Sequence, residues 1–226
     1  MRNWRYAHTD PDIHPELIQS EIIKKMLGKY DAYTEDNTEI FFIDPYENFF
    51  FSIADLHDSG VWEHDMGEFL TEDGTIDEAY WDMPLKRIQL PVIRVIYITQ
   101  HRRRSGRLQR IVEDIKEVSD TTGESIALFA DPFRISGYGR ELNAREAFKK
   151  FMENGYEPTE NFAHDLIKLR SRYMDLGFRN IKFSNAQLTK PYQHLAYISK
   201  NAPAAERQLL ESLEVEYVVN PDLKLD

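Results

Sequence analysis

The chain has 226 residues, of which 42% are hydrophobic and 12% aromatic, so a substantial core can be buried. No apolar run approaches the ~18 residues that cross a bilayer, and no secretory signal is visible at the start. Without cysteine there are no disulfides and no cysteine nucleophile. The net charge of -11 argues against a nucleic-acid binder, because phosphate recognition needs a basic surface. A cytoplasmic protein without membrane or nucleic-acid partners is therefore expected.

The N-terminal third predicts a strand, a helix and two more strands. Residues 4–7 form a short candidate strand, and apolar residues at helical spacing predict a helix over 12–27. Two segments rich in Phe and Ile, 39–43 and 49–53, are separated by turn residues and predict a strand pair. The acidic segment that follows, at about 55–85, has no sustained period, so we interpret it as an insertion.

The middle of the chain carries the strongest pattern. Residues 88–98 predict a strand, with Pro91 indicating its start, an edge or a bulge. A single apolar stripe predicts a helix from Ser105, its expected N-cap, to Val118. A short apolar strand over 125–130 follows. Strand, helix and strand at these lengths predict parallel strands with a right-handed crossover.

The remaining elements complete a mixed α/β pattern. Helices are expected over 143–154, 160–176 and 204–213, and strands over 178–183, 195–199 and 215–219. The stretch 133–162 is expected to be a second insertion, of helical character. We therefore predict one α/β domain over residues 1–226.

A local concentration of positive charge precedes the central helix. Five Arg and one His lie between His101 and Arg110, in an otherwise acidic chain. A helix N-terminus presents unpaired N–H groups and a partial positive charge, and a nearby Gly lets a phosphate approach the backbone. This segment is a candidate anion site, although an Arg-rich turn is more often simply a solvated loop.

The same segment resembles motif A of the GNAT superfamily of N-acetyltransferases, Q/R-x-x-G-x-G/A. The matching residues are Arg103, Arg104, Ser105, Gly106, Arg107 and Leu108. The resemblance implies a mixed, strongly twisted GNAT-like sheet flanked by helices, with acetyl-CoA as co-substrate. In this family the loop amides hold the coenzyme A pyrophosphate, and the preceding strand, here at Ile96 and Ile98, binds the pantetheine arm.

A second resemblance lies further along the chain, in the expected order. Residues 173–178, Tyr-Met-Asp-Leu-Gly-Phe, are similar to the GNAT motif B, Y-x-x-x-G-F. The resemblance implies that Tyr173 is the general acid that protonates the departing thiolate, which is a suitable task for a phenol. Without the resemblance, Tyr173 would be read as an amphipathic core residue.

The sequence also departs from the family pattern. Leu108 stands where Gly or Ala is usual, and such a bulky residue either crowds the loop or shifts the start of the helix. Leu166 replaces an Asn often found seven residues before the Tyr. For the general base, Asp131 after the second parallel strand is the first candidate and Glu63 the second, although each also fits an ordinary surface or turn carboxylate.

The preferred function is transfer of an acetyl group from acetyl-CoA to a primary amine by direct attack. The acceptor would be a small molecule or a protein amine, and the acidic chain would steer cationic acceptors toward it. The main alternative is an inactive GNAT-like scaffold, for which the two insertions would supply surfaces for a homo-oligomer or an assembly partner. A third reading is an unrelated α/β nucleotide binder. No metal site is expected.

Overall fold

The computed structural model describes residues 5–6, 20–34, 39–46, 48–54, 61–62, 87–88, 90–99, 106–130, 132–136, 143–181, 194–212 and 214. The helices of this part of the chain are α1 (Glu21–Leu27), α2 (Arg107–Thr122), α3 (Ala144–Asn154), α4 (Phe162–Asp175) and α5 (Ala204–Ser212). Its strands are β1 (Arg5–Tyr6), β2 (Asp31–Thr34), β3 (Glu39–Ile43), β4 (Phe49–Ala54), β5 (Val61–Trp62), β6 (Arg87–Ile88), β7 (Val92–Ile98), β8 (Ile126–Phe129), β9 (Phe133–Ile135), β10 (Tyr156–Pro158), β11 (Arg179–Asn180) and β12 (His194–Tyr197).

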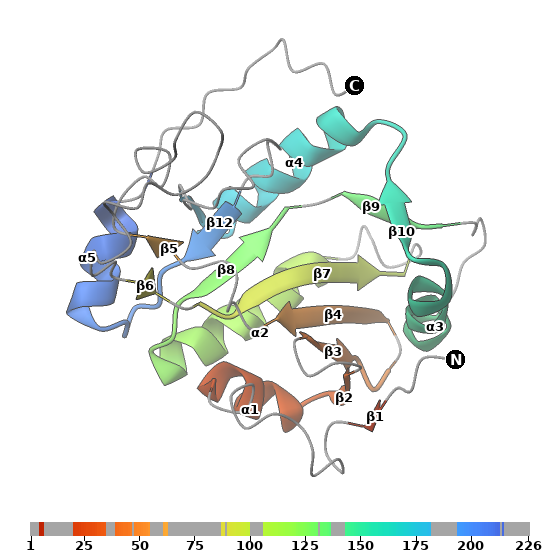
Figure 1. Ribbon diagram of the computed structural model, residues 1–226, viewed down its shortest axis with the longest axis horizontal. Coiled ribbons are helices and arrows are strands. Elements are labelled where there is room, and N and C mark those ends of the chain that lie inside the picture. Colours follow the sequence, from red (N-terminus) through yellow and green to blue (C-terminus); the bar gives the residue numbers. More distant parts are fainter. Residues whose placement is uncertain are drawn as a thin grey trace, which may run out of the picture.

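Eight of the described strands form one sheet, in the order β1-β2-β3-β4-β7-β8-β12-β11 (Figure 1). Its neighbouring strands are antiparallel, except that β7 and β8 run parallel and are connected through α2. The predicted strand–helix–strand unit and the predicted pair of β3 and β4 are therefore confirmed. A parallel pair in the middle of an otherwise antiparallel sheet, flanked by helices, is the mixed α/β architecture that the sequence predicts.

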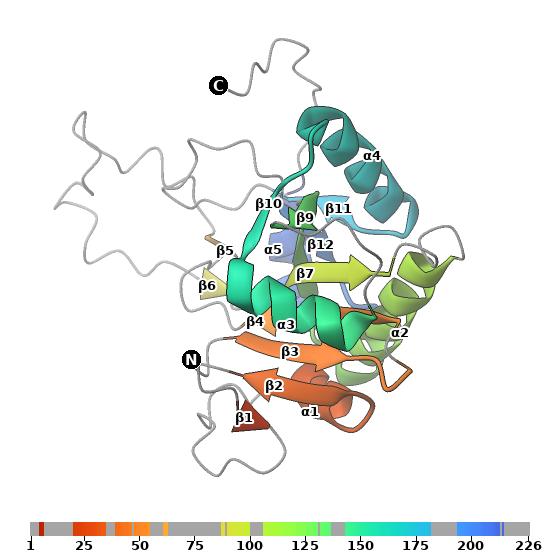
Figure 2. The same ribbon diagram turned by 90° about the vertical axis from the view of Figure 1, so that its right-hand side faces the viewer.

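Helices cover both faces of this sheet, as Figures 1 and 2 show. The largest core cluster packs α1, α2 and α4 against one face, and α3 packs on the opposite face over β3, β4 and β7. Successive strand residues point to opposite faces, so Phe42 and Phe51 enter the first cluster while Phe41 and Phe50 enter the second. Because both faces are covered, all four rings are buried, and β3 and β4 are apolar at most positions.

The strand expected over 88–98 is in fact two strands separated at Pro91. Arg87–Ile88 pairs with β5, and β7 begins only at Val92. Proline has no N–H to give to a ladder, which explains the break. Its carbonyl oxygen is nevertheless used, because it accepts a hydrogen bond from the N–H of Ala127 at 2.9 Å. Pro91 thus marks a strand start, and its carbonyl joins β7 to β8 at that point.

The central helix starts later and ends later than the sequence predicts. Its N-cap is Gly106 rather than Ser105, and it extends past Val118 to Thr122. At its end Gly123 adopts a left-handed conformation, with φ of 79°, and its N–H bonds the carbonyl of Ser119. Helix α1 is capped by Ser20, whose side chain accepts from the N–H of Ile23. The earlier part of its predicted range lies outside the described residues.

The expected helical insertion at 133–162 contains strands as well as α3. β9 precedes α3 in the chain and β10 follows it, and the two strands form an antiparallel pair. Tyr156 on β10 stacks on Phe151 of α3, with 5.5 Å between the ring centres. Strands of three residues are too short for a periodic pattern, so the sequence did not predict them. Most of the 55–85 segment lies outside the described residues, as does the strand expected over 215–219.

The C-terminal elements extend the sheet beyond β8. β12 confirms the strand expected over 195–199, one residue earlier, and β11 is shorter than the strand expected over 178–183. Among the described residues, no helix combines the length and apolarity needed to cross a bilayer.

Candidate functional site

The two parallel strands separate along their length. The ladder between β7 and β8 pairs Val92 with Ala127 and Ile93 with Leu128. On its other edge β7 pairs with β4 all the way to Ile98. The β7–β8 ladder therefore ends five residues before β7 does, where only Phe129 of β8 remains. Figure 1 shows the two strands diverging toward their C-terminal ends. The motif resemblance would place the cofactor in an opening between these two strands, which we call the cofactor slot, and this placement remains a prediction.

A β-bulge in β7 decides which side chains face this region. Ser52 pairs with Val95 and Ile53 with Ile93, so Arg94 is an extra residue on β7. The extra residue shifts the alternation by one position. Ile96 and Ile98 consequently pack against the same core cluster as Ile93, on the α2 and α4 side of the sheet. The contacts predicted for the backbone of Ile96 and Ile98 remain a prediction.

Gly106 has the geometry that a tight turn before a helix requires. Its φ of 73° and ψ of 12° place it in the left-handed region, which glycine adopts without steric cost. A Cβ at this position would meet no heavy atom of the described residues within 4 Å. No side-chain cap and no acidic residue occupies the first turn of α2 within the described residues. The first N–H groups of α2 are thus suited to an anion.

Leu108 does not stand in the turn itself. It is the second residue of α2, half-buried, and it packs against the main core cluster. Of the two consequences expected from a bulky residue here, the structure supports the shifted helix start. Arg107, the first residue of α2, is half-buried.

Tyr173 lies on the inner face of α4, near its end. Its side chain is only 3% exposed, and its ring makes an edge contact with Phe178 at 5.9 Å. Burial raises the pKa of the Tyr173 phenol above its ordinary value, because the phenolate would lose its hydration. The phenol therefore keeps its proton at physiological pH. Tyr173, Leu108, Ile96 and Ile98 all contact one cluster, so the fold brings both sequence motifs to the same side of the sheet.

Arg170 was not singled out by the sequence. It lies one turn before Tyr173 on the same face of α4 and is 1% exposed. A buried guanidinium is a strong local positive charge, and it adds to the electrostatics of this face. Its position three residues before Tyr173 in a helix could have indicated that Arg170 faces the core. An Arg within a helix is, however, normally interpreted as solvent-exposed.

Several predicted site residues fall outside the described residues. Arg103, Arg104 and Ser105 of the loop belong to this group, as do both candidate bases, Asp131 and Glu63. Asp131 follows Ala130, directly after β8. The roles expected for these residues remain predictions.

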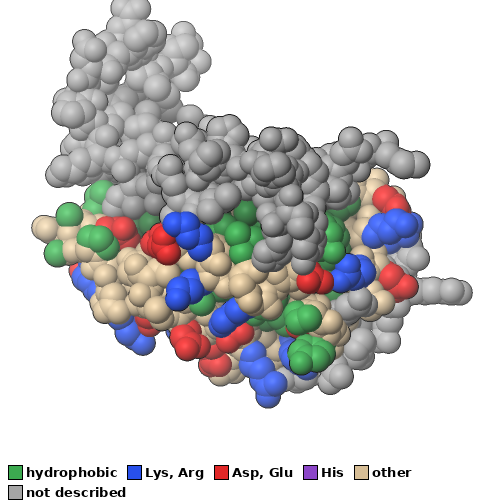
Figure 3. All heavy atoms as spheres, turned by 90° about the horizontal axis from the view of Figure 1, so that it is seen from below, with side chains coloured by type: hydrophobic (Ala, Val, Ile, Leu, Met, Phe, Trp, Pro, Cys, Tyr) green, Lys and Arg blue, Asp and Glu red, His purple; other side chains and the backbone are tan. Residues whose placement is uncertain are grey.

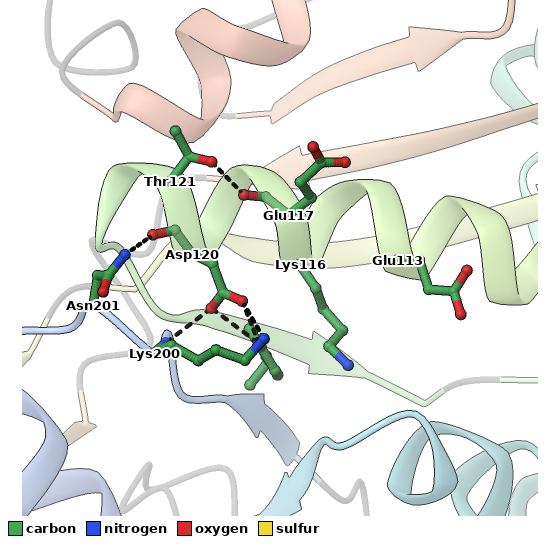
Figure 4. Close-up of a pocket in the computed structure, with 8 residues that line it drawn as sticks. Glu113, Lys116, Glu117, Asp120, Thr121, Lys200 and Asn201 are labelled. Carbon is green, nitrogen blue, oxygen red and sulfur yellow. Dashed lines mark hydrogen bonds and ion pairs between the residues drawn. The ribbon is translucent and has the colours of Figure 1, made fainter.

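The described surface mixes charges of both signs. On the face shown in Figure 3, Lys and Arg side chains are interspersed with Asp and Glu side chains over the described residues. A shallow groove of about 400 Å³ runs along the second half of α2, on the side of β12 (Figure 4). This groove lies away from Gly106 and the N-terminal end of α2, so it is distinct from the expected cofactor slot.

Comparison with known proteins gives one distant structural likeness. No protein-family model matches the chain, and no curated protein matches its sequence. A crystal structure of AtaTR bound with AcCoA aligns over 88% of this chain and 94% of that chain, at 9% identity and a TM-score of 0.32. At this distance the alignment assigns no role to any residue.

Proposed function

We propose that this protein is an N-acetyltransferase that moves an acetyl group from acetyl-CoA to a primary amine by direct attack. One observation carries the proposal. The β7–β8 ladder ends at Ile93, and α2 starts after the left-handed Gly106, on the side of the sheet where Tyr173 lies. A diverging strand pair beside a helix start that has no side-chain cap within the described residues suits a long ligand that carries a phosphate at one end.

The chain's own residues would divide the binding between them. The N–H groups at the start of α2 and the arginines at 103, 104 and 107 would hold the pyrophosphate. The backbone of β7 near Ile96 and Ile98 would bind the pantetheine arm. Acetyl-CoA would supply the activated thioester.

The transfer itself requires two proton movements. The neutral amine attacks the thioester carbonyl, so that a C–N bond forms, the C–S bond breaks and the thiolate leaves. Asp131 would take the proton that the amine gives up, and Tyr173 would give its proton to the thiolate. Because burial raises the pKa of Tyr173, the phenol is fully protonated beforehand, but proton donation leaves a poorly solvated phenolate. The Tyr173 phenol would therefore give its proton to the thiolate and regain one before the next reaction.

The alternative remains an inactive GNAT-like scaffold that binds or assembles with other molecules. The burial of Tyr173, at 3% exposure, favours this alternative, because a core tyrosine needs no catalytic role. The two proposals are distinguished by whether the protein binds acetyl-CoA and also transfers its acetyl group.

Calorimetric titration of the purified protein with acetyl-CoA and with CoA tests the proposal. Saturable binding is expected, and it should be abolished by Arg103→Ala and by Gly106→Pro, since proline cannot adopt a φ near 73°. Tyr173→Phe should leave binding intact and slow turnover about 10²-fold or more. Absence of binding at millimolar ligand would exclude the enzyme, and binding without turnover would favour the scaffold.

A further inference from the structure

Lys116 of α2 reaches across to the end of α4. Its Nζ donates a hydrogen bond of 2.5 Å to the carbonyl oxygen of Leu176, the C-cap residue of α4. The last carbonyls of a helix have no partner within the helix, and the helix dipole makes this end negative. A lysine ammonium there satisfies one carbonyl and complements the dipole. Lys116 thus caps α4 from a neighbouring helix.

The capped turn is the one that carries Tyr173. The carbonyl oxygen of Tyr173 accepts hydrogen bonds from the N–H groups of Leu176 and Phe178, each at 3.1 Å. The ring of Phe178 contacts two other rings, those of Tyr173 and of Tyr197 on β12, each at 5.9 Å between ring centres. Movement of Leu176 would therefore move both the backbone and the ring that fix Tyr173.

Lys116 is itself held in place by a contact with β12. Its Nζ lies 4.8 Å from the centre of the Tyr197 ring, in a cation–π contact. The Tyr197 hydroxyl bonds both carboxylate oxygens of Asp120, at 2.9 and 3.0 Å, one turn further along α2. Asp120 also accepts from the backbone N–H of Lys200 at 2.8 Å. Figure 4 shows Lys116 and Asp120 extending from the same side of α2, toward β12.

Helix α2 thus connects the proposed phosphate-binding turn at Gly106 with the turn of α4 that carries Tyr173. Gly106 caps the start of α2, and Lys116 lies ten residues further along, about 15 Å at the helical rise. We propose that Lys116 is a positioning residue, which sets Tyr173 relative to the cofactor slot by capping α4 from α2. This inference rests on the proposed acetyltransferase function, and it adds a residue that neither sequence motif contains.

The first test measures the cap directly, without turnover. Lys116→Met keeps the apolar stem and removes the ammonium, and amide hydrogen exchange followed by NMR reports on the last turn of α4. Faster exchange of the Leu176 and Phe178 amides is expected, while Lys116→Arg should restore protection. The matched control is Glu117→Gln, because Glu117 is exposed and points away from the Lys116 ammonium in Figure 4. Unchanged exchange in Lys116→Met would overturn the proposal.

The second test asks whether the cap acts through Tyr173. With acetyl-CoA and spermidine, Lys116→Met should lower kcat about ten- to a hundredfold, the effect of a small misplacement, with the KM for acetyl-CoA unchanged. In a Tyr173→Phe background the same substitution should have no further effect on kcat. An equal loss in both backgrounds would overturn the positioning role while leaving the proposed function intact. If the unmodified protein bound no acetyl-CoA, the proposed function would fail, and the catalytic role of the cap with it.

Discussion

The two edges of β7 differ in a way that separates stability from the proposed function. Toward β4 the strand is paired to its last residue, Ile98, and lies in a sheet of stacked and buried aromatic rings. Toward β8, within the described residues, the ladder pairs only Val92 and Ile93. The first edge holds the fold together, whereas the second is joined at one end and diverges at the other. A strand that is secured on one edge can leave its other edge open to a ligand.

The first prediction addresses the paired edge and has the largest expected effect. Phe51 is fully buried between α1 and the sheet, where it stacks on Phe42 at 5.1 Å. Phe51→Ala should lower the free energy of unfolding by about 3–5 kcal/mol, because it removes apolar contacts and leaves a cavity. Urea unfolding measures the loss. Tyr46→Ala is the control, since Tyr46 is 83% exposed, and it should change stability by less than about 0.5 kcal/mol.

The second prediction addresses the short ladder between β7 and β8, at the end where Ala127 bonds Pro91. Ala127→Pro removes the N–H that bonds the Pro91 carbonyl, and it places a ring within the ladder. The expected loss of stability is about 3 kcal/mol. Ala127→Ser keeps the N–H and should cost clearly less in the same urea titration. If the two variants were equally destabilised, side-chain packing rather than this bond would hold β7 to β8.

The third prediction concerns the turn that precedes α2. Gly106→Ala meets no steric obstacle, but alanine is strained at a φ of 73°. The expected loss is about 1–2 kcal/mol of unfolding free energy, together with weaker binding of CoA in a calorimetric titration. Gly28→Ala is a matched control, because Gly28 has a φ of -77°. If the two variants lost the same unfolding free energy and bound CoA equally well, the left-handed conformation of Gly106 would contribute to neither.

The smallest expected effect is a pH dependence at the groove beside α2. Burial, and then the hydrogen bonds to Asp120, raise the pKa of Tyr197 to about 12. The folded protein therefore holds this proton more tightly than the unfolded chain, in which a tyrosine has a pKa of ~10. The resulting stability is complete below about pH 10 and is lost as the pH rises through about 12.

A comparison of urea midpoints with Tyr197→Phe checks this dependence. The advantage of the unmodified protein over Tyr197→Phe should be constant up to about pH 10 and narrow above it. An advantage that stayed equal at pH 8 and pH 11 would contradict the assigned hydrogen bonds. Asp120 behaves in the opposite sense. Burial alone would raise its pKa, but the bonds from Lys200 and Tyr197 lower it overall, so its contribution is lost in acid.

The sequence predicted those elements whose patterns are long. The apolar stripe of α2 and the strands around it gave the parallel unit, and the two motifs placed Gly106 and Tyr173 on elements that the fold brings to one side of the sheet. Lys116 was missed because a single lysine in an amphipathic helix looks like any solvated residue. Its partner is a backbone carbonyl 60 residues away, which leaves no mark in the local pattern.

Local irregularities also escaped the sequence. The bulge at Arg94 interrupts a segment, Val-Ile-Arg-Val-Ile-Tyr-Ile, that is apolar at almost every position. With both faces of the sheet buried there is no polar alternation whose phase could reveal an extra residue. β9 and β10, of three residues each, are equally invisible to a periodicity argument.

The bulge has a consequence for how this chain can change. One added residue turns Ile96 and Ile98 toward α2 and α4. Deletion of Arg94 would turn the rest of β7 over. The side chains that now face α2 and α4 would face α3, and those that face α3 would face α2 and α4. Tyr97, which stacks on Phe50 on the α3 side, would then face α2. Which side chains of β7 face α2 and α4 thus depends on the number of residues in the strand as well as on their types.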